Sequence, residues 1–143
     1  MALANPKFED SYGRLFGPDI GLSEQTDAFF RKFYQHFLRH PAIAAMFSNT
    51  DMDQQVQMLK RSLMHLVAFY VTGNPSDELK RMAAIHHRLN VRSEHFDLWL
   101  DAILQTVQET DPKADEATLL AWCWALTPGI TYMRLSQELH GLG

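Results

Sequence analysis

Two adjacent histidines, His86 and His87, lie in the stretch 79–96, the part of the chain best suited to carry chemistry. At helical spacing His86 shares a face with Leu79 and Met82, so its imidazole is expected to point inward with an apolar stripe. His87 falls about a third of a turn away and is expected to face water. An inward imidazole is either a core histidine satisfied by a hydrogen bond or a ligand of a metal.

A second helical stretch places one polar side chain among apolar ones. The helix expected from about 52 to 72 carries a stripe of residues at helical spacing: Met52, Val56, Leu59, Leu63 and Leu66. Gln55 lies on this stripe, whereas Lys60 and Arg61 lie off it. The amide of a glutamine can donate a hydrogen bond. Gln55 is therefore either a surface residue on an imperfect stripe or a donor to whatever the inward imidazole binds.

Breakers and caps divide the chain into helices that position these two groups. The expected helices cover residues 6–16, 23–40, 41–47, 52–72, 77–90, 93–111 and 114–139. Ser23 and Ser76 are expected N-caps, and Asn49, Thr50 or Asp51 is expected to cap the helix over 52–72. Asn90 is expected to end the helix that carries His86. Pro128 lies inside the last helix and should kink it. No stretch alternates as a strand does, so the chain is expected to be all-α, with some six to eight packed helices.

Composition excludes several classes of protein. The chain has 143 residues, of which 46% are hydrophobic and 21% charged, as expected for a single domain over 1–143 with a substantial core. A net charge of -4 without any Lys/Arg run argues against a nucleic-acid surface. No apolar run approaches about 18 residues, so no membrane span is expected.

The single cysteine and the N-terminus bear on location. Cys123 is the only cysteine, which excludes a disulfide framework and a thiolate metal cluster. The first residues show no basic segment followed by an apolar run, so no secretion signal is expected. Together these features predict a reducing, cytoplasmic location.

Common catalytic motifs are missing from the sequence. It contains no glycine-rich phosphate loop, no HExxH, no CxxC and no GxSxG, and it lacks the ExxH pairs of a di-iron bundle. An inward imidazole, inward aromatics and a glutamine on a facing stripe remain. This set suits a planar iron macrocycle, because a porphyrin supplies four nitrogens and needs one axial ligand and an apolar slot.

The chain resembles the globin family over nearly its whole length. The resemblance rests on FYQHFLRHPAIAAMF (33–47), DMDQQVQMLKRSL (51–63) and IHHRLNVRSEHF (85–96). It is strongest to bacterial single-domain globins and to the haem domains of globin-coupled sensors. The resemblance implies a globin-like bundle around a pocket for haem b, iron protoporphyrin IX.

The resemblance also assigns individual pocket residues. In globins the proximal histidine lies five residues before a valine, which selects His86 as the iron ligand and Val91 as the valine. The distal position on the second helix matches Phe33 when counted back from Pro41, and Tyr34 when counted forward from the FY pair; we favour Phe33 and keep both. The other pocket residues expected are Phe47, which would stack on the haem, Gln55 and Leu59 on the distal side, and Met82, Phe96 and Leu100.

One departure from related globins bears on function. Flavohaemoglobins, which detoxify nitric oxide, carry a tyrosine and a glutamate that polarise the proximal histidine, and here Phe96 and Gln137 stand at those positions. The resemblance therefore implies reversible binding of dioxygen, CO and NO, as an oxygen carrier, a store or a stand-alone gas sensor. The alternative is an enzyme, a nitric oxide dioxygenase that needs a separate reductase.

Residues outside the pocket suggest possible partners. A sensor would need a signalling partner, because ligand binding must bias a second state. Trp122 is expected in the core and Trp124 at a helix-contact surface, where it could mark a homodimer face on the last two helices. The remaining histidines are expected at the surface or at interfaces: His36, His40, His65, His95 and His140.

Overall fold

A computed structural model describes residues 5–17 and 26–142, with side chains described up to residue 136. These residues form seven α-helices: α1 (Pro6–Phe16), α2 (Asp27–Phe37), α3 (Pro41–Met46), α4 (Met52–Thr72), α5 (Asp77–Arg88), α6 (Ser93–Thr110) and α7 (Glu116–Leu142). No strand occurs within these ranges, which confirms the expected all-α class. None of the helices searched there is long and apolar enough to cross a bilayer.

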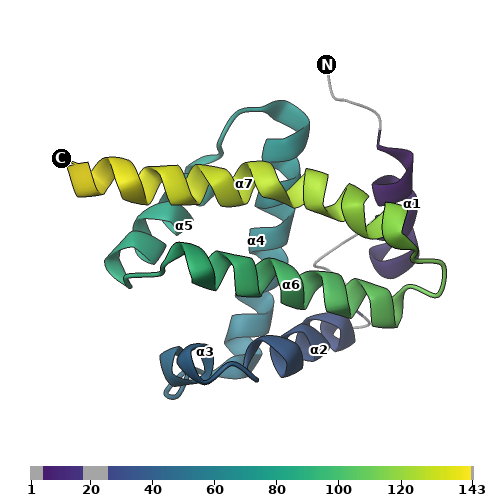
Figure 1. The fold of residues 1–143 in the computed structure, drawn as a ribbon, viewed down its shortest axis with the longest axis horizontal. Coiled ribbons are helices and arrows are strands. Elements are labelled where there is room, and N and C mark those ends of the chain that lie inside the picture. The colour runs from purple at the N-terminus through teal and green to yellow at the C-terminus, as the bar shows by residue number, and fades with distance from the viewer. Residues whose placement is uncertain (1–4, 18–25, 143) are drawn as a thin grey trace.

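Two layers of helices cross in this fold (Figure 1). The long helices α6 and α7 run side by side, and α4 crosses behind them. The helix α7 packs against α1, α4, α5 and α6, while α2 packs against α4 and α6. The largest fully buried side chains include Trp122, Phe30, Phe33, Leu63 and Leu126. The core thus lies where α7 packs against α4 and where α2 packs against α4 and α6.

The capping residues of α4 and α5 act as expected. The Asp51 carboxylate accepts hydrogen bonds from the backbone N–H groups of Asp53 and Gln54, at 3.0 and 3.3 Å. The Ser76 hydroxyl accepts one from the backbone of Leu79 at 3.0 Å. Each side chain satisfies N–H groups that have no partner inside the helix.

A tight turn ends α5 next to the candidate histidine. Asn90 adopts a left-handed conformation with φ 57°, which asparagine tolerates better than most residues. The backbone N–H of Val91 donates to the carbonyl of His86, and that of Asn90 donates to His87, both at 3.1 Å. These two bonds form a Schellman motif. The prediction that Asn90 ends this helix is confirmed.

The second expected helix is shorter than predicted. It ends at Phe37 rather than at residue 40, and the expected N-cap at Ser23 lies outside the described residues. His40 is extended, with ψ 119°. The cause is Pro41, whose ring disfavours helical backbone in the preceding residue.

Two charged or ionisable side chains expected outside the core are buried. Lys60 is only 3% exposed and is paired with Asp27 of α2. His36 is 7% exposed, and its Nε2 lies 2.9 Å from the Glu109 carboxylate on α6. His36 was expected at the surface or at an interface, but it is buried between α2 and α6, where the Glu109 carboxylate compensates its burial.

A buried polar network joins the N-terminal helix to the turn between α6 and α7. Arg14 contacts Asp111 with two nitrogens, both at 2.8 Å, and the Ser11 hydroxyl donates to the same carboxylate at 2.6 Å. The indole of Trp122 donates to Ser11 at 2.9 Å. Trp122 is fully buried, as expected, whereas Trp124 is 64% exposed.

Candidate functional site

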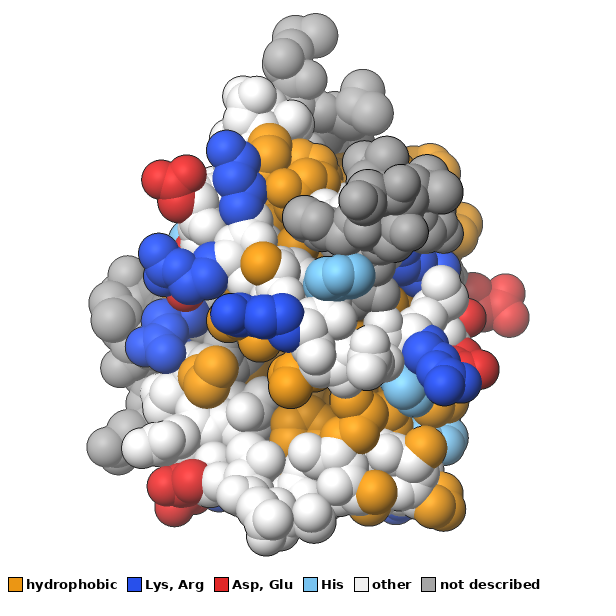
Figure 2. Space-filling view, turned by 90° about the vertical axis from the view of Figure 1, so that its left-hand side faces the viewer, with side chains coloured by type: hydrophobic (Ala, Val, Ile, Leu, Met, Phe, Trp, Pro, Cys, Tyr) orange, Lys and Arg blue, Asp and Glu red, His pale blue; other side chains and the backbone are white. Residues whose placement is uncertain are grey.

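One cavity contains most of the residues that the sequence selected. It holds about 940 Å³ of empty space, counted with its open mouth. Most of its lining is apolar and comes from every helix between α2 and α7. Figure 2 shows the face that carries α3 and α5, where hydrophobic side chains reach the surface beside histidine and lysine or arginine side chains.

The imidazole of His86 is oriented by its own helix. Its Nδ1 donates a hydrogen bond to the backbone carbonyl of Met82, one turn earlier in α5, at 2.6 Å. This bond places the proton of the neutral ring on Nδ1 and leaves the lone pair of Nε2 available to a metal. His86 lines the cavity. An imidazole prepared in this way, in an apolar cavity, fits the axial ligand of a haem.

All of the predicted pocket residues except Phe33 and Leu100 line the cavity. Those that do are Tyr34, Phe47, Gln55, Leu59, Met82, His86, Val91 and Phe96. Leu100 is partly buried and packs against the core. The eight residues come from α2, α4, α5, α6 and two connecting turns, so the fold gathers them from distant parts of the sequence.

Tyr34, rather than Phe33, is the residue that α2 presents to the cavity. Phe33 is fully buried and packs edge-on against Trp99, with ring centroids 5.8 Å apart. The ring of Tyr34 meets that of Phe47 at 5.9 Å, and both rings line the cavity. The preference for Phe33 as the residue facing a ligand is therefore not supported by its position.

Tyr34 and Gln55 form a hydrogen-bonded pair across the cavity wall. Burial raises the pKa of Tyr34 to about 12, and the side-chain hydrogen bond with Gln55 acts in the opposite direction. With its pKa near 12, the Tyr34 hydroxyl is protonated at neutral pH and can donate a hydrogen bond.

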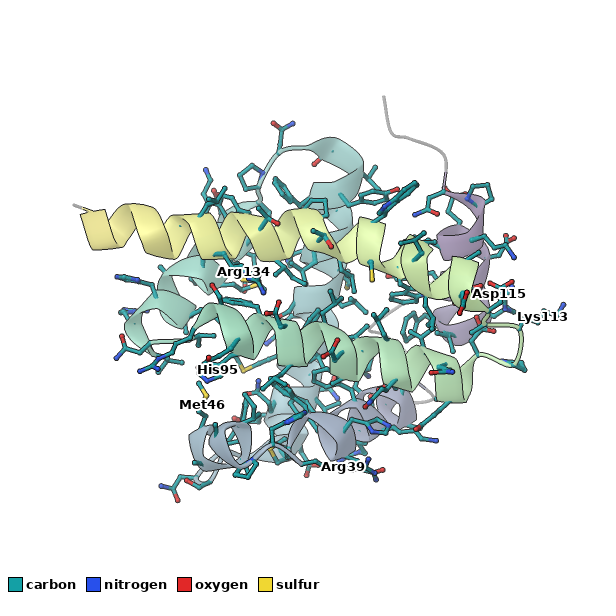
Figure 3. All side chains as sticks on the ribbon, in the orientation of Figure 1. Arg39, Met46, His95, Lys113, Asp115 and Arg134 are labelled. Carbon is teal, nitrogen blue, oxygen red and sulfur yellow. The ribbon has the colours of Figure 1, made fainter. Side chains whose placement is uncertain are left out.

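Sequence reasoning missed His95 as a cavity residue. We expected it at the surface or at an interface, but it lines the cavity together with Met46, in the region between α6 and α3 (Figure 3). Its Nδ1 accepts a hydrogen bond from the backbone N–H of Arg92 at 3.0 Å, so the neutral ring carries its proton on Nε2. His95 lies three residues after the N-cap Arg92 and caps it, but this spacing does not mark a cavity residue.

Several further lining residues were not predicted for the pocket, and two of them are exposed. Met46 and Met58 line the cavity and are exposed to solvent, on α3 and α4 respectively. A side chain that contacts both the cavity and solvent cannot be assigned to the inner or the outer face of its helix from hydrophobic periodicity. Ser62 and Ile85 complete this part of the lining.

Comparisons with known proteins agree with this geometry. The sequence matches a family model described as bacterial-like globin over residues 15–125. Among solved structures, it is similar to a Pseudomonas aeruginosa protein that is described as structurally highly homologous to a human hemoglobin. The two are 36% identical, with a TM-score of 0.79 over 94% of this chain and 98% of the other. No curated protein sequence matches this chain significantly.

Proposed function

Since this chain belongs to the bacterial-like globin family, whose members bind haem, we propose that it holds haem b through His86 and reversibly binds dioxygen, CO or NO. Its role would be that of an oxygen carrier, a store or a stand-alone gas sensor. The observation that carries the proposal is the hydrogen bond from His86 Nδ1 to Met82, which leaves Nε2 available in an apolar cavity.

Some of the cavity residues would hold the cofactor, and others would contact the gas ligand. Haem, when bound, supplies an iron with a coordination position open to a diatomic gas. His86 would hold that iron, and Phe47, Leu59 and Val91 would exclude water from it. On the opposite side, the Tyr34 hydroxyl would donate a hydrogen bond to a polar gas ligand, while Gln55 orients the phenol.

The absorption spectrum of the purified protein tests the proposal. We expect a Soret band, and we expect the ferrous form to change its spectrum reversibly on addition of dioxygen or CO. His86→Ala should abolish retention of haem, whereas the neighbouring variant His87→Ala should keep it. A colourless protein that does not take up added hemin would refute the proposal, and loss of haem only in His87→Ala would move the iron ligand to that residue.

An enzymatic role is the alternative that the same cavity allows. A nitric oxide dioxygenase would need a separate reductase, and its relatives polarise the proximal histidine through a phenol. Phe96 lines the cavity near His86 without a hydroxyl group, which favours reversible binding over turnover. Nitrate production from NO in the presence of a reductase would support the enzyme instead.

The exposed face of α7 supports the predicted homodimer. Leu120, Trp124 and Leu135 are exposed on this helix, and their spacing places them on one side of it. Apolar patches of this kind often mark contact surfaces. Sedimentation of the Trp124→Glu variant against the wild type tests it, because a charge on the patch should favour the monomer. The lone Cys123 is consistent with the cytoplasmic location that we also propose.

A further inference from the structure

Phe96 contacts both the candidate iron ligand His86 and the guanidinium of Arg134. The ring of Phe96 lies 5.9 Å from the imidazole of His86, centroid to centroid, with 30° between their planes. On Phe96, in turn, lies the guanidinium of Arg134, 5.7 Å from the ring centroid. This distance falls within the range of a cation–π interaction. A positive charge from α7 therefore sits one aromatic ring away from the imidazole.

Contacts with the first turns of α6 hold Arg134 in place. Its Nη2 donates to the backbone carbonyl of Ser93 at 2.9 Å and is paired with the carboxylate of Asp97. Its Nε is buried and has no hydrogen-bond partner among the described residues. Figure 3 shows the side chain reaching from α7 into the space beside α6. The guanidinium is thus fixed over Phe96 rather than extended into solvent.

The paired carboxylate cancels only part of this charge. The Arg134 side chain is 30% exposed, whereas that of Asp97 is 68% exposed. Water and salt screen an exposed anion more strongly than a cation stacked on a buried ring. Phe96 itself is buried. The side of the pair that faces the imidazole is therefore positive.

We propose that Arg134 tunes the proximal side of the haem site electrostatically, acting as a positioning residue for His86 that favours ferrous over ferric iron. A nearby cation makes the imidazole a weaker electron donor and disfavours added positive charge on the metal. This effect is opposite in sign to that of the glutamate that stands behind the proximal histidine in flavohaemoglobins. The inference rests on the proposed function, because it requires haem on His86.

Reduction potentials of the haem-loaded protein test the inference. Arg134→Met should shift the ferrous-to-ferric equilibrium toward ferric by about two- to fivefold, or roughly 20–40 mV at 59 mV per tenfold change. Arg134→Lys should recover part of the shift, because it keeps the charge. Asp97→Asn should move the potential in the opposite direction, a result that simple loss of packing would not produce.

Arg92→Met is the matched control for overall charge. Arg92 stands just before α6 and its side chain is 77% exposed, so the variant removes an arginine close to the same helix end and leaves Arg134 and Phe96 unchanged. We expect its potential to stay near that of the wild type. The iron–histidine stretching frequency of the ferrous protein, measured by resonance Raman, should rise in Arg134→Met and not in Arg92→Met.

The outcomes separate this inference from the proposed function. Protein without haem would refute the function itself, whereas haem that stays bound in His86→Ala would show that another residue holds the iron. Haem held by His86, with equal potentials in the wild type and Arg134→Met, would overturn the inference alone. If Arg134→Met does not fold, the Asp97→Asn variant still tests the inference. We expect its reduction potential to rise, so an unchanged or lowered potential would contradict the proposed effect of the arginine charge.

Discussion

At the scale of single residues, ligand affinity should depend on the pair formed by Tyr34 and Gln55. Because the phenol keeps its proton, we expect Tyr34→Phe to raise the dioxygen off-rate about five- to tenfold, the effect of losing one neutral hydrogen bond. Gln55→Leu should raise it less, since it removes the group that orients the donor. Flash photolysis or stopped-flow mixing measures both rates.

A double variant distinguishes the roles of the two residues. If Gln55 acts through Tyr34, the off-rate of Tyr34→Phe/Gln55→Leu should equal that of Tyr34→Phe alone. Met58→Leu is a suitable control, because Met58 lines the same cavity and the replacement keeps its apolar character and approximate volume. An off-rate that rises in Gln55→Leu but not in Tyr34→Phe would make the amide the donor.

The residue scale also shows where prediction from sequence succeeds and where it stops. Helical spacing placed His86 on the inner face of its helix, and it does line the cavity. Its role as iron ligand, which the globin resemblance implied through the distance to Val91, stays a prediction. The choice between Phe33 and Tyr34 could not be made, because counting back from Pro41 and counting forward from the FY pair give different residues. Only the packing of α2 in the fold shows that Tyr34 lines the cavity.

At the scale of helices, the crossing of α4 and α7 depends on Gly129. A Cβ at this position would collide with Cδ2 of Leu66, a buried side chain that also lines the cavity. We expect Gly129→Ala to lower the free energy of unfolding by roughly 1–2 kcal/mol, because the leucine must leave its preferred rotamer. Displacement of Leu66 should also speed the transfer of hemin to apomyoglobin.

Gly13→Ala provides the control for this prediction. A Cβ at Gly13 meets no atom within 4 Å, and the residue lies inside α1. We expect this change to stabilise the protein by about 0.5–1 kcal/mol, through better helix propensity alone. Urea unfolding of both variants measures the difference, and equal stabilities would show that α7 shifts to accommodate the methyl group.

Breakers and caps allowed most helix ends to be predicted, because they act locally. Asp51, Ser76 and Asn90 each satisfy or redirect backbone groups within a few residues. The burial of Lys60 and His36 could not be foreseen in the same way. Their partners, Asp27 and Glu109, belong to other helices, and a sequence pattern does not reveal such pairings.

At the scale of the whole molecule, acid stability should depend on Asp111. The Arg14 side-chain hydrogen bonds lower the pKa of Asp111 from 3.8 to about 2, against the opposing effect of burial. The carboxylate therefore stabilises the fold fully above about pH 4. As the pH falls from 4 toward 2, the unfolded chain takes up its proton first and this stabilisation is lost.

The Asp111→Asn variant isolates this contribution. We expect it to be less stable than the wild type by roughly 1–2 kcal/mol at pH 7, with the gap closing between pH 4 and pH 2. Urea unfolding at several pH values, followed by circular dichroism, measures both curves. A gap that stays constant across this range would mean that packing, rather than ionisation, explains the loss.

This long-range network lay beyond sequence analysis for a simple reason. Ser11 and Asp111 are separated by 100 positions, and nothing in either local pattern connects them. The all-α class followed from periodicity, since each amphipathic helix must bury its stripe. Whether two polar residues so far apart in the sequence come into contact depends on how all the helices between them pack.

The turn at Asn90 has a consequence for recognising distant relatives. The five-residue interval from His86 to Val91 is the span of one backbone hydrogen bond, from the N–H of Val91 to the carbonyl of His86. The interval is thus set by the way α5 ends and does not indicate iron binding. Chains that lost their haem during evolution would keep it as long as this corner was retained, so a search pattern built on the spacing needs the imidazole as a separate criterion.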